Sequence, residues 1–63
     1  MYKYKVHYLI WGRPNKKNSI SKIQIFLFPH ETPRSALRSQ LAKNHGIDEE
    51  LIEITKIDLT RSS

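Results

Sequence analysis

Aromatic and basic residues interleave along two stretches of this sequence, residues 1–11 and 20–28. If both stretches are neighbouring strands, one face of the sheet carries aromatic rings together with ammonium groups. Rings of this kind stack on unpaired bases, and lysines contact the phosphates between them. The pattern predicts a small basic module that binds RNA or single strands through this face. The residues concerned are Trp11, Phe26, Phe28, Lys3, Lys5 and Lys22.

Two further groups of cations are candidate phosphate contacts. The first group lies in residues 12–19, where turn-forming residues are dense. The second group is two arginines that are separated by one turn of a predicted helix. Arginine and lysine side chains at such places contact phosphates without reading sequence. A charged loop is also ordinary solvated surface in most proteins. The cations are Arg13, Lys16 and Lys17 in the loop, and Arg34 and Arg38 in the helix.

The same face has a second interpretation. A thin sheet with apolar residues on both faces commonly hides the second face against another copy or another subunit. The stems of Lys3 and Lys5 can also lie across Phe28 and Phe26, as an ordinary surface contact. The alternative prediction is therefore a protein-interaction or structural subunit, whose open sheet face forms a homodimer or partner interface.

The net charge of +5 is unevenly spread along the chain. Residues 1–22 hold six cations and no acid, whereas residues 48–63 hold five acids and two cations. A basic segment favours a polyanionic partner, because phosphates that are neutralised by it release counterions. A net charge of about 2 to 8 is also ordinary for a small soluble domain. The charge alone does not separate the two interpretations.

Signals for catalysis, cofactors and metals are missing from the sequence. No nucleophile motif or oxyanion loop surrounds any serine, and neither glycine belongs to a phosphate-binding loop. There is no cysteine, and His7, His30 and His45 lie too far apart for a zinc spacing. No apolar run approaches the roughly 20 residues of a membrane span. We therefore expect a cytoplasmic non-enzyme with no cofactor, no metal and no membrane contact.

Alternation of apolar and polar residues predicts a hairpin of two strands, residues 1–11 and 20–28, joined by the basic loop of residues 12–19. If the loop closes symmetrically, the residue numbers of each directly opposed pair add up to 31. A sum of 29 or 33 would change the individual pairs but would keep the same side chains on each face of the hairpin. This register joins the two apolar stripes on the inner face and leaves the aromatic and basic residues outside. The expected pairs are Tyr8 with Ile23, Val6 with Ile25, and Tyr4 with Leu27.

A helix is expected over residues 33–45, with Thr32 as its N-cap and Pro33 as its first residue. Its apolar stripe is narrow and depends on Leu37 and Leu41, so the inner face of the hairpin must cover it. Gly46 is expected to end the helix in a left-handed conformation. Ile47 then falls where a Schellman motif makes its hydrophobic contact, on Leu41 or Ala42.

A third strand is expected over residues 51–59, followed by a tail at residues 60–63. Its apolar residues change parity, because Ile52 and Ile54 are even-numbered while Ile57 and Leu59 are odd-numbered. Either a bulge near Thr55 restores one face, or the strand changes the side that it serves. A right-handed crossover places this strand beside the first. The prediction is a single small α+β domain, residues 1–63, with β-β-α-β order, a three-stranded sheet in the order 2-1-3 and the helix on one face.

Overall fold

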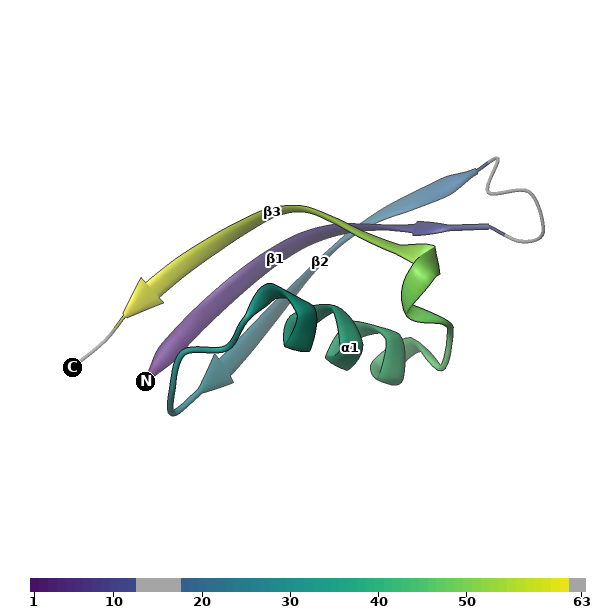
Figure 1. Ribbon diagram of the computed structural model, residues 1–63. Helices are drawn as coiled ribbons and strands as arrows, with labels where there is room; N and C mark the ends of the chain where they lie inside the picture. The colour runs from purple at the N-terminus through teal and green to yellow at the C-terminus, as the bar shows by residue number, and fades with distance from the viewer. Residues whose placement is uncertain (13–17, 62–63) are drawn as a thin grey trace.

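The computed structural model describes residues 1–12 and 18–61 of the chain. The three strands form one antiparallel sheet in the order β2-β1-β3, with the helix on one side of it (Figure 1). The predicted α+β class, element order and strand order are confirmed. The elements are β1 (Tyr2–Trp11), β2 (Ser19–Phe28), α1 (Arg34–His45), the short 3-10 helix η1 (Glu49–Leu51) and β3 (Ile52–Arg61).

The end of β3 corrects one predicted boundary. Thr60 and Arg61 belong to the strand and not to a tail, because β1 begins at Tyr2 and offers them partners: Lys3 opposes Thr60, and Tyr2 opposes Arg61. Residues 13–17 of the predicted basic loop, with Arg13, Lys16 and Lys17, lie outside the described residues, as do the last two residues of the predicted tail, and Ser19 belongs to β2.

The start of α1 also differs from the prediction by one residue. Pro33 is the N-cap, with an extended backbone (φ −69°, ψ 158°), and the helix begins at Arg34. The carbonyl of Pro33 accepts the N–H groups of Ala36 and Leu37, which closes the first turn. Thr32 makes no cap: its hydroxyl donates to the carbonyl of His30 at 3.4 Å, and its backbone N–H donates to the hydroxyl of Tyr4 at 2.7 Å. This bond attaches the entry of the helix to the central strand.

The predicted end of the helix is confirmed. Gly46 has φ 65° and ψ 36°, a left-handed conformation that a residue without Cβ adopts without strain. Its N–H donates to the carbonyl of Lys43, and the N–H of Ile47 donates to the carbonyl of Ala42. These two bonds are the Schellman motif. They turn the chain so that Ile47 packs against the core.

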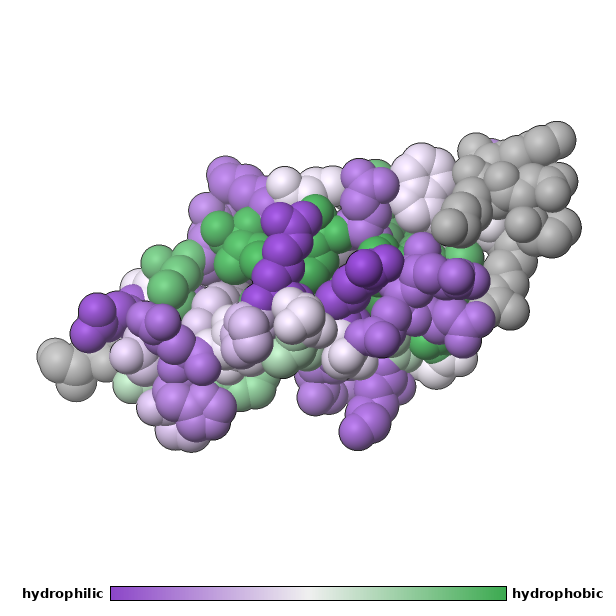
Figure 2. All heavy atoms as spheres, viewed as in Figure 1, coloured by the Kyte–Doolittle hydropathy of each residue, from purple (hydrophilic) through white to green (hydrophobic). Residues whose placement is uncertain are grey.

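The core lies between α1 and the helix side of the sheet. The side chains of Leu37 and Leu41 are fully buried, as the narrow apolar stripe of the helix requires. Around the helix, hydrophilic side chains lie beside and across patches of apolar surface (Figure 2). The buried residues that form the core cluster are Tyr4, Val6, Tyr8, Phe26, Leu37, Leu41, Ala42, Ile52 and Ile54.

A β-bulge keeps the apolar residues of β3 on one face. The pairing with β1 shifts between His7 and Tyr8, which leaves Thr55 between the partners of these two residues. The hydroxyl of Thr55 donates to the carbonyl of His7 at 3.1 Å. Ile54 and Ile57, which have opposite parity, therefore both face the helix side. Of the two alternatives for this strand, the bulge is confirmed.

The register of the hairpin is the main correction. Opposed residues of β1 and β2 sum to 30: Tyr8 opposes Lys22, Val6 opposes Gln24 and Tyr4 opposes Phe26. A shift of one residue moves every side chain of a strand to its other face. The prediction that Ile23, Ile25 and Leu27 line the core is wrong, and so is the prediction that Phe26 and Phe28 lie on the outer face.

Two observations explain this register. The N–H of Gly12 donates to the carbonyl of Asn18 at 2.8 Å, so the hairpin closes at this pair instead of one residue further along. The core then receives the two large rings of β2. Phe26 is buried and stacks on Phe28 with centroids 5.9 Å apart, and Phe28 meets Tyr4 edge to face at 6.1 Å. Aromatic rings bury more apolar area than aliphatic side chains do.

Candidate interaction surface

The side of the sheet away from α1 is called the open face here. By strand alternation and register it receives the odd-numbered residues of β1 and β2, Glu53 of β3 before the bulge, and the even-numbered residues of β3 beyond the bulge. Its members are Lys3, Lys5, His7, Leu9, Trp11, Ser19, Ser21, Ile23, Ile25, Leu27, Glu53, Lys56, Asp58 and Thr60.

An apolar stripe runs along β2 on this face. Ile23, Ile25 and Leu27 are 56%, 52% and 62% exposed, although side chains of this kind usually avoid water. They follow one another at period two on a single strand, so they form a continuous row and are not scattered surface residues. We call these three residues the β2 stripe. Contiguous exposed apolar surface of this kind marks interaction sites.

Lysines of the central strand border the β2 stripe. Lys3 opposes Leu27, and Lys5 opposes Ile25. Both lysines are exposed, so their ammonium groups lie in solvent beside an apolar row. The open face is therefore apolar at the β2 edge and charged along its middle.

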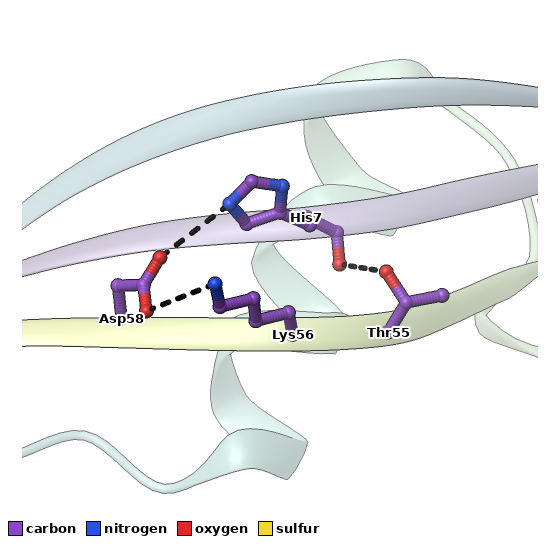
Figure 3. A network of polar contacts seen from close by, with 4 residues as sticks. All are labelled: His7, Thr55, Lys56 and Asp58. Carbon is purple, nitrogen blue, oxygen red and sulfur yellow. Dashed lines mark hydrogen bonds and ion pairs between the residues drawn. The ribbon is translucent and has the colours of Figure 1, made fainter.

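The β3 side of the open face carries a polar network (Figure 3). Nε2 of His7 lies 3.5 Å from a carboxylate oxygen of Asp58, and the ammonium group of Lys56 lies 3.8 Å from the other. The bulge residue Thr55 joins the network through the carbonyl of His7. His7 lies on β1, and Lys56 and Asp58 lie on β3, so the contact between His7 and Asp58 joins the two strands on the open face.

Trp11 lies far from the lysines of its own strand. It lies six positions along β1 from Lys5, which at about 3.3 Å per residue is roughly 20 Å. Its indole N–H donates to a carboxylate oxygen of Glu53 at 3.2 Å, which ties the ring to β3. Of the predicted face, Lys3, Lys5 and Trp11 keep their side of the sheet. Lys22, Phe26 and Phe28 are on the helix side, so the predicted cluster of three rings among lysines does not form.

The two arginines of α1 also lie on the helix side, and both are hydrogen-bonded. Arg34 donates to the carbonyl of Ile54, and Nε of Arg38 donates to the carbonyl of Glu49 at 2.9 Å. The hydroxyl of Ser39 donates to the carboxylate of the same Glu49. These contacts attach the helix to η1 and β3. The predicted phosphate contacts of α1 are therefore on the opposite side of the sheet from Lys3 and Lys5.

Tyr8 of the central strand makes a polar contact with the end of α1. Burial raises the pKa of the Tyr8 hydroxyl, which lies 2.8 Å from Nε2 of His45. This contact joins the central strand to the end of α1.

Within residues 1–12 and 18–61, no three His, Asp or Glu side chains gather closely enough to hold a metal ion. In the same part of the chain, no helix has the length and apolarity to cross a membrane.

The β2 stripe is the feature that sequence reasoning assigned to the wrong face. Residues 20–28 hold two apolar sets, one odd-numbered and one that ends in the two phenylalanines, and only the register decides between them. The phenylalanines of β2 and the tyrosines of β1 are all even-numbered, and this shared parity was the available signal that opposed residue numbers add up to an even number.

Comparisons with protein-family models, with curated proteins and with solved structures find no match for this chain.

Proposed function

We propose that this protein is an interaction module that binds another protein chain through β2 and the open face. The observation that carries the proposal is the β2 stripe, three aliphatic side chains in a row that are each more than half exposed. Covering such a row removes apolar area from water, which is the main driving force of association. The proposal keeps the expectation of a cytoplasmic protein without catalytic activity.

The charges on the open face support a partner that lies at the β2 edge. Lys3 and Lys5 occupy the central strand, and burying an ammonium group without a paired carboxylate is costly. A partner that pairs along the edge lies beside the β2 stripe, contacts its side chains from one side and leaves these lysines in solvent. Assembly through β2 therefore buries part of the apolar row at no cost in buried charge.

Site-specific photo-crosslinking tests this function. A photoreactive amino acid at Ile25, in the middle of the β2 stripe, should give discrete protein crosslinks in the cells that make the protein. The matched control is the same amino acid at Ser35, an exposed residue of α1 on the other side of the sheet. We expect crosslinks from Ile25 and none from Ser35. Equal crosslinking at both positions would contradict a specific interface on β2.

Nucleic-acid binding is the second candidate, favoured by the exposed Lys3 and Lys5 and by the acid-free basic segment of residues 1–22. We expect the affinity for a mixed oligonucleotide to fall as salt rises from about 50 to about 200 mM. Changing both lysines to glutamine should flatten the salt dependence by about two units of slope, about one per phosphate contact.

Lys43→Gln is the control for this measurement, because Lys43 is an exposed cation in the last turn of α1, on the helix side. It should leave the salt slope unchanged. No binding by the unaltered chain at about 50 mM salt and micromolar concentration would remove the candidate.

A further inference from the structure

The two edges of the sheet differ in how they are protected against pairing. Natural edge strands discourage pairing with charges and bulges. β3 has both, since it carries the bulge at Thr55 and the charged residues Glu53, Lys56 and Asp58. β2 has no bulge and is nearly uncharged: it pairs with β1 over ten residues without a register shift and carries a single charged residue, Lys22. The edge of β2 is therefore open to another strand.

The hydrogen-bond phase of the hairpin identifies the residues that face outward. In an antiparallel pair, residues alternate between those whose N–H and C=O groups point to the neighbour and those whose groups point away. Gly12 and Asn18 are joined by a backbone hydrogen bond, so both are residues whose groups point to the neighbouring strand. Even-numbered residues of β2 therefore bond to β1, and odd-numbered residues point their backbone groups outward. The residues of the β2 stripe are all odd-numbered, so each offers backbone groups at the edge and an apolar side chain beside it.

We infer that the occupant of this edge is a second copy of the chain, paired antiparallel along β2 to form one continuous six-stranded sheet from two three-stranded ones. This rests on the proposed function, since it specifies the partner of the same surface. A two-fold axis makes such an interface self-complementary, because each copy contributes the same strand.

The position of the two-fold axis along β2 follows from the pairing of the apolar residues in the β2 stripe. With the axis at Ile25, this residue opposes its own copy, and Ile23 opposes Leu27, so apolar side chains meet apolar side chains throughout. With the axis at Gln24, Ser21 would oppose Leu27, and with the axis at Ile23, Ser21 would oppose Ile25. Opposed apolar pairs stabilise an antiparallel ladder. The register centred on Ile25 is the one that pairs the complete stripe.

Charge also favours a second copy at this edge over two copies stacked face to face. In the register centred on Ile25, Lys22 opposes Phe28 of the other copy, so no like charges meet across the new ladder. Stacking the open faces would instead take Lys3 and Lys5 of both central strands out of water, which is costly for each ammonium group. The helix leaves room for edge pairing, since α1 packs toward η1 and β3 at the other edge. A contact of one strand is smaller than a standard interface, so we expect a reversible dimer in the micromolar range.

Sedimentation velocity of the full chain, from about 1 to about 500 µM, tests the assembly. We expect a monomer at the low end and a dimer of twice 7.5 kDa at the high end. Ile25→Lys opposes two ammonium groups on the axis and should raise the dissociation constant at least about 100-fold. The control Ser21→Lys puts the same charge on the same face of β2, outside the apolar pairs, and should leave the dimer in place. Circular dichroism of both variants checks that the fold is retained, and equal loss of the dimer in both would overturn this interface.

Cysteine substitution tests the register, because the chain contains no cysteine of its own. Ile25→Cys places two thiols opposite each other, about 5.5 Å apart between Cα atoms, so mild oxidation should give a covalent dimer. Ile23→Cys places the two thiols four residues apart along the ladder, about 14 Å, and should stay monomeric under the same conditions. Equal oxidation of both variants would overturn the register centred on Ile25.

The outcomes separate this inference from the function on which it rests. A chain that stays monomeric up to the highest concentration overturns the second copy as the occupant. Photo-crosslinks from Ile25 to a protein of a different mass would also overturn the second copy, while the interaction function would stay intact. Loss of both the dimer and the crosslinks would remove the function itself.

Discussion

Phe26→Ala should lower the free energy of unfolding by about 3–5 kcal/mol. The ring is 9% exposed and lies in the core cluster, stacked on Phe28. Its removal costs the transfer energy of the ring and leaves a cavity that the sheet and helix fill only in part. Urea denaturation followed by circular dichroism measures the change. In a domain of this size a single core supplies only about 3–5 kcal/mol, so the variant should be largely unfolded without denaturant.

The neighbouring Ile25→Ala is the control for this prediction. Ile25 is 52% exposed on the open face, and in the monomer its truncation should cost less than about 1 kcal/mol, as surface substitutions do. The comparison is made at low protein concentration, where dimerisation does not contribute. The difference between the unfolding free energies of the two variants therefore shows which face of β2 packs on the helix. A large loss for Ile25→Ala with a small loss for Phe26→Ala would reverse the two faces of β2 and take the β2 stripe away from the surface.

Leu41→Ala should destabilise the protein by about 2–5 kcal/mol. Leu41 is fully buried, and with Leu37 it forms the main apolar contact of α1 with the sheet. A short helix with so few anchors has little stability outside its tertiary contacts. We therefore expect the thermal midpoint to fall steeply or the cooperative transition to disappear, as measured by circular dichroism during heating.

Two variants keep this experiment interpretable. Leu59→Ala removes the same atoms from a side chain that is 46% exposed on β3, and its thermal midpoint should change little. Leu41→Met conserves the volume at the buried position and should cost less than about 1.5 kcal/mol, so it should fold. A Leu41→Ala protein that melts like Leu59→Ala would contradict the proposed role of this residue in docking the helix.

The two faces of β2 have different roles, one in the core and one in assembly. Phe26 and Phe28 point to the helix and contribute to the core, whereas the β2 stripe points away from it. Substitutions in the stripe should therefore change assembly without unfolding the monomer. This separation is what makes Ile25→Lys a usable test of the interface.

Local patterns in the chain were sufficient for the elements and their order. Alternation of side chains in residues 2–11 marks a strand, and Gly46 followed by Ile47 marks the end of a helix, because each depends on the conformational preferences of neighbouring residues. The change of parity between Ile54 and Ile57 correctly raised the possibility of a bulge. The predicted N-cap is one residue early, because the pattern Thr-Pro does not reveal that the hydroxyl of Thr32 donates to the carbonyl of His30.

The candidate site depended on contacts between distant residues, and there local patterns did not suffice. Residues 20–28 carry apolar side chains on both parities, so the sequence is compatible with either face of β2 packing on the helix. Closure of the loop at Gly12 and Asn18, together with burial of two phenylalanine rings against Tyr4, selected the even-numbered set. Because the side-chain period of a strand is two, this choice of one residue moved the rings into the core and the aliphatic row to the surface. The tertiary structure alone thereby decided that the exposed face of β2 is aliphatic.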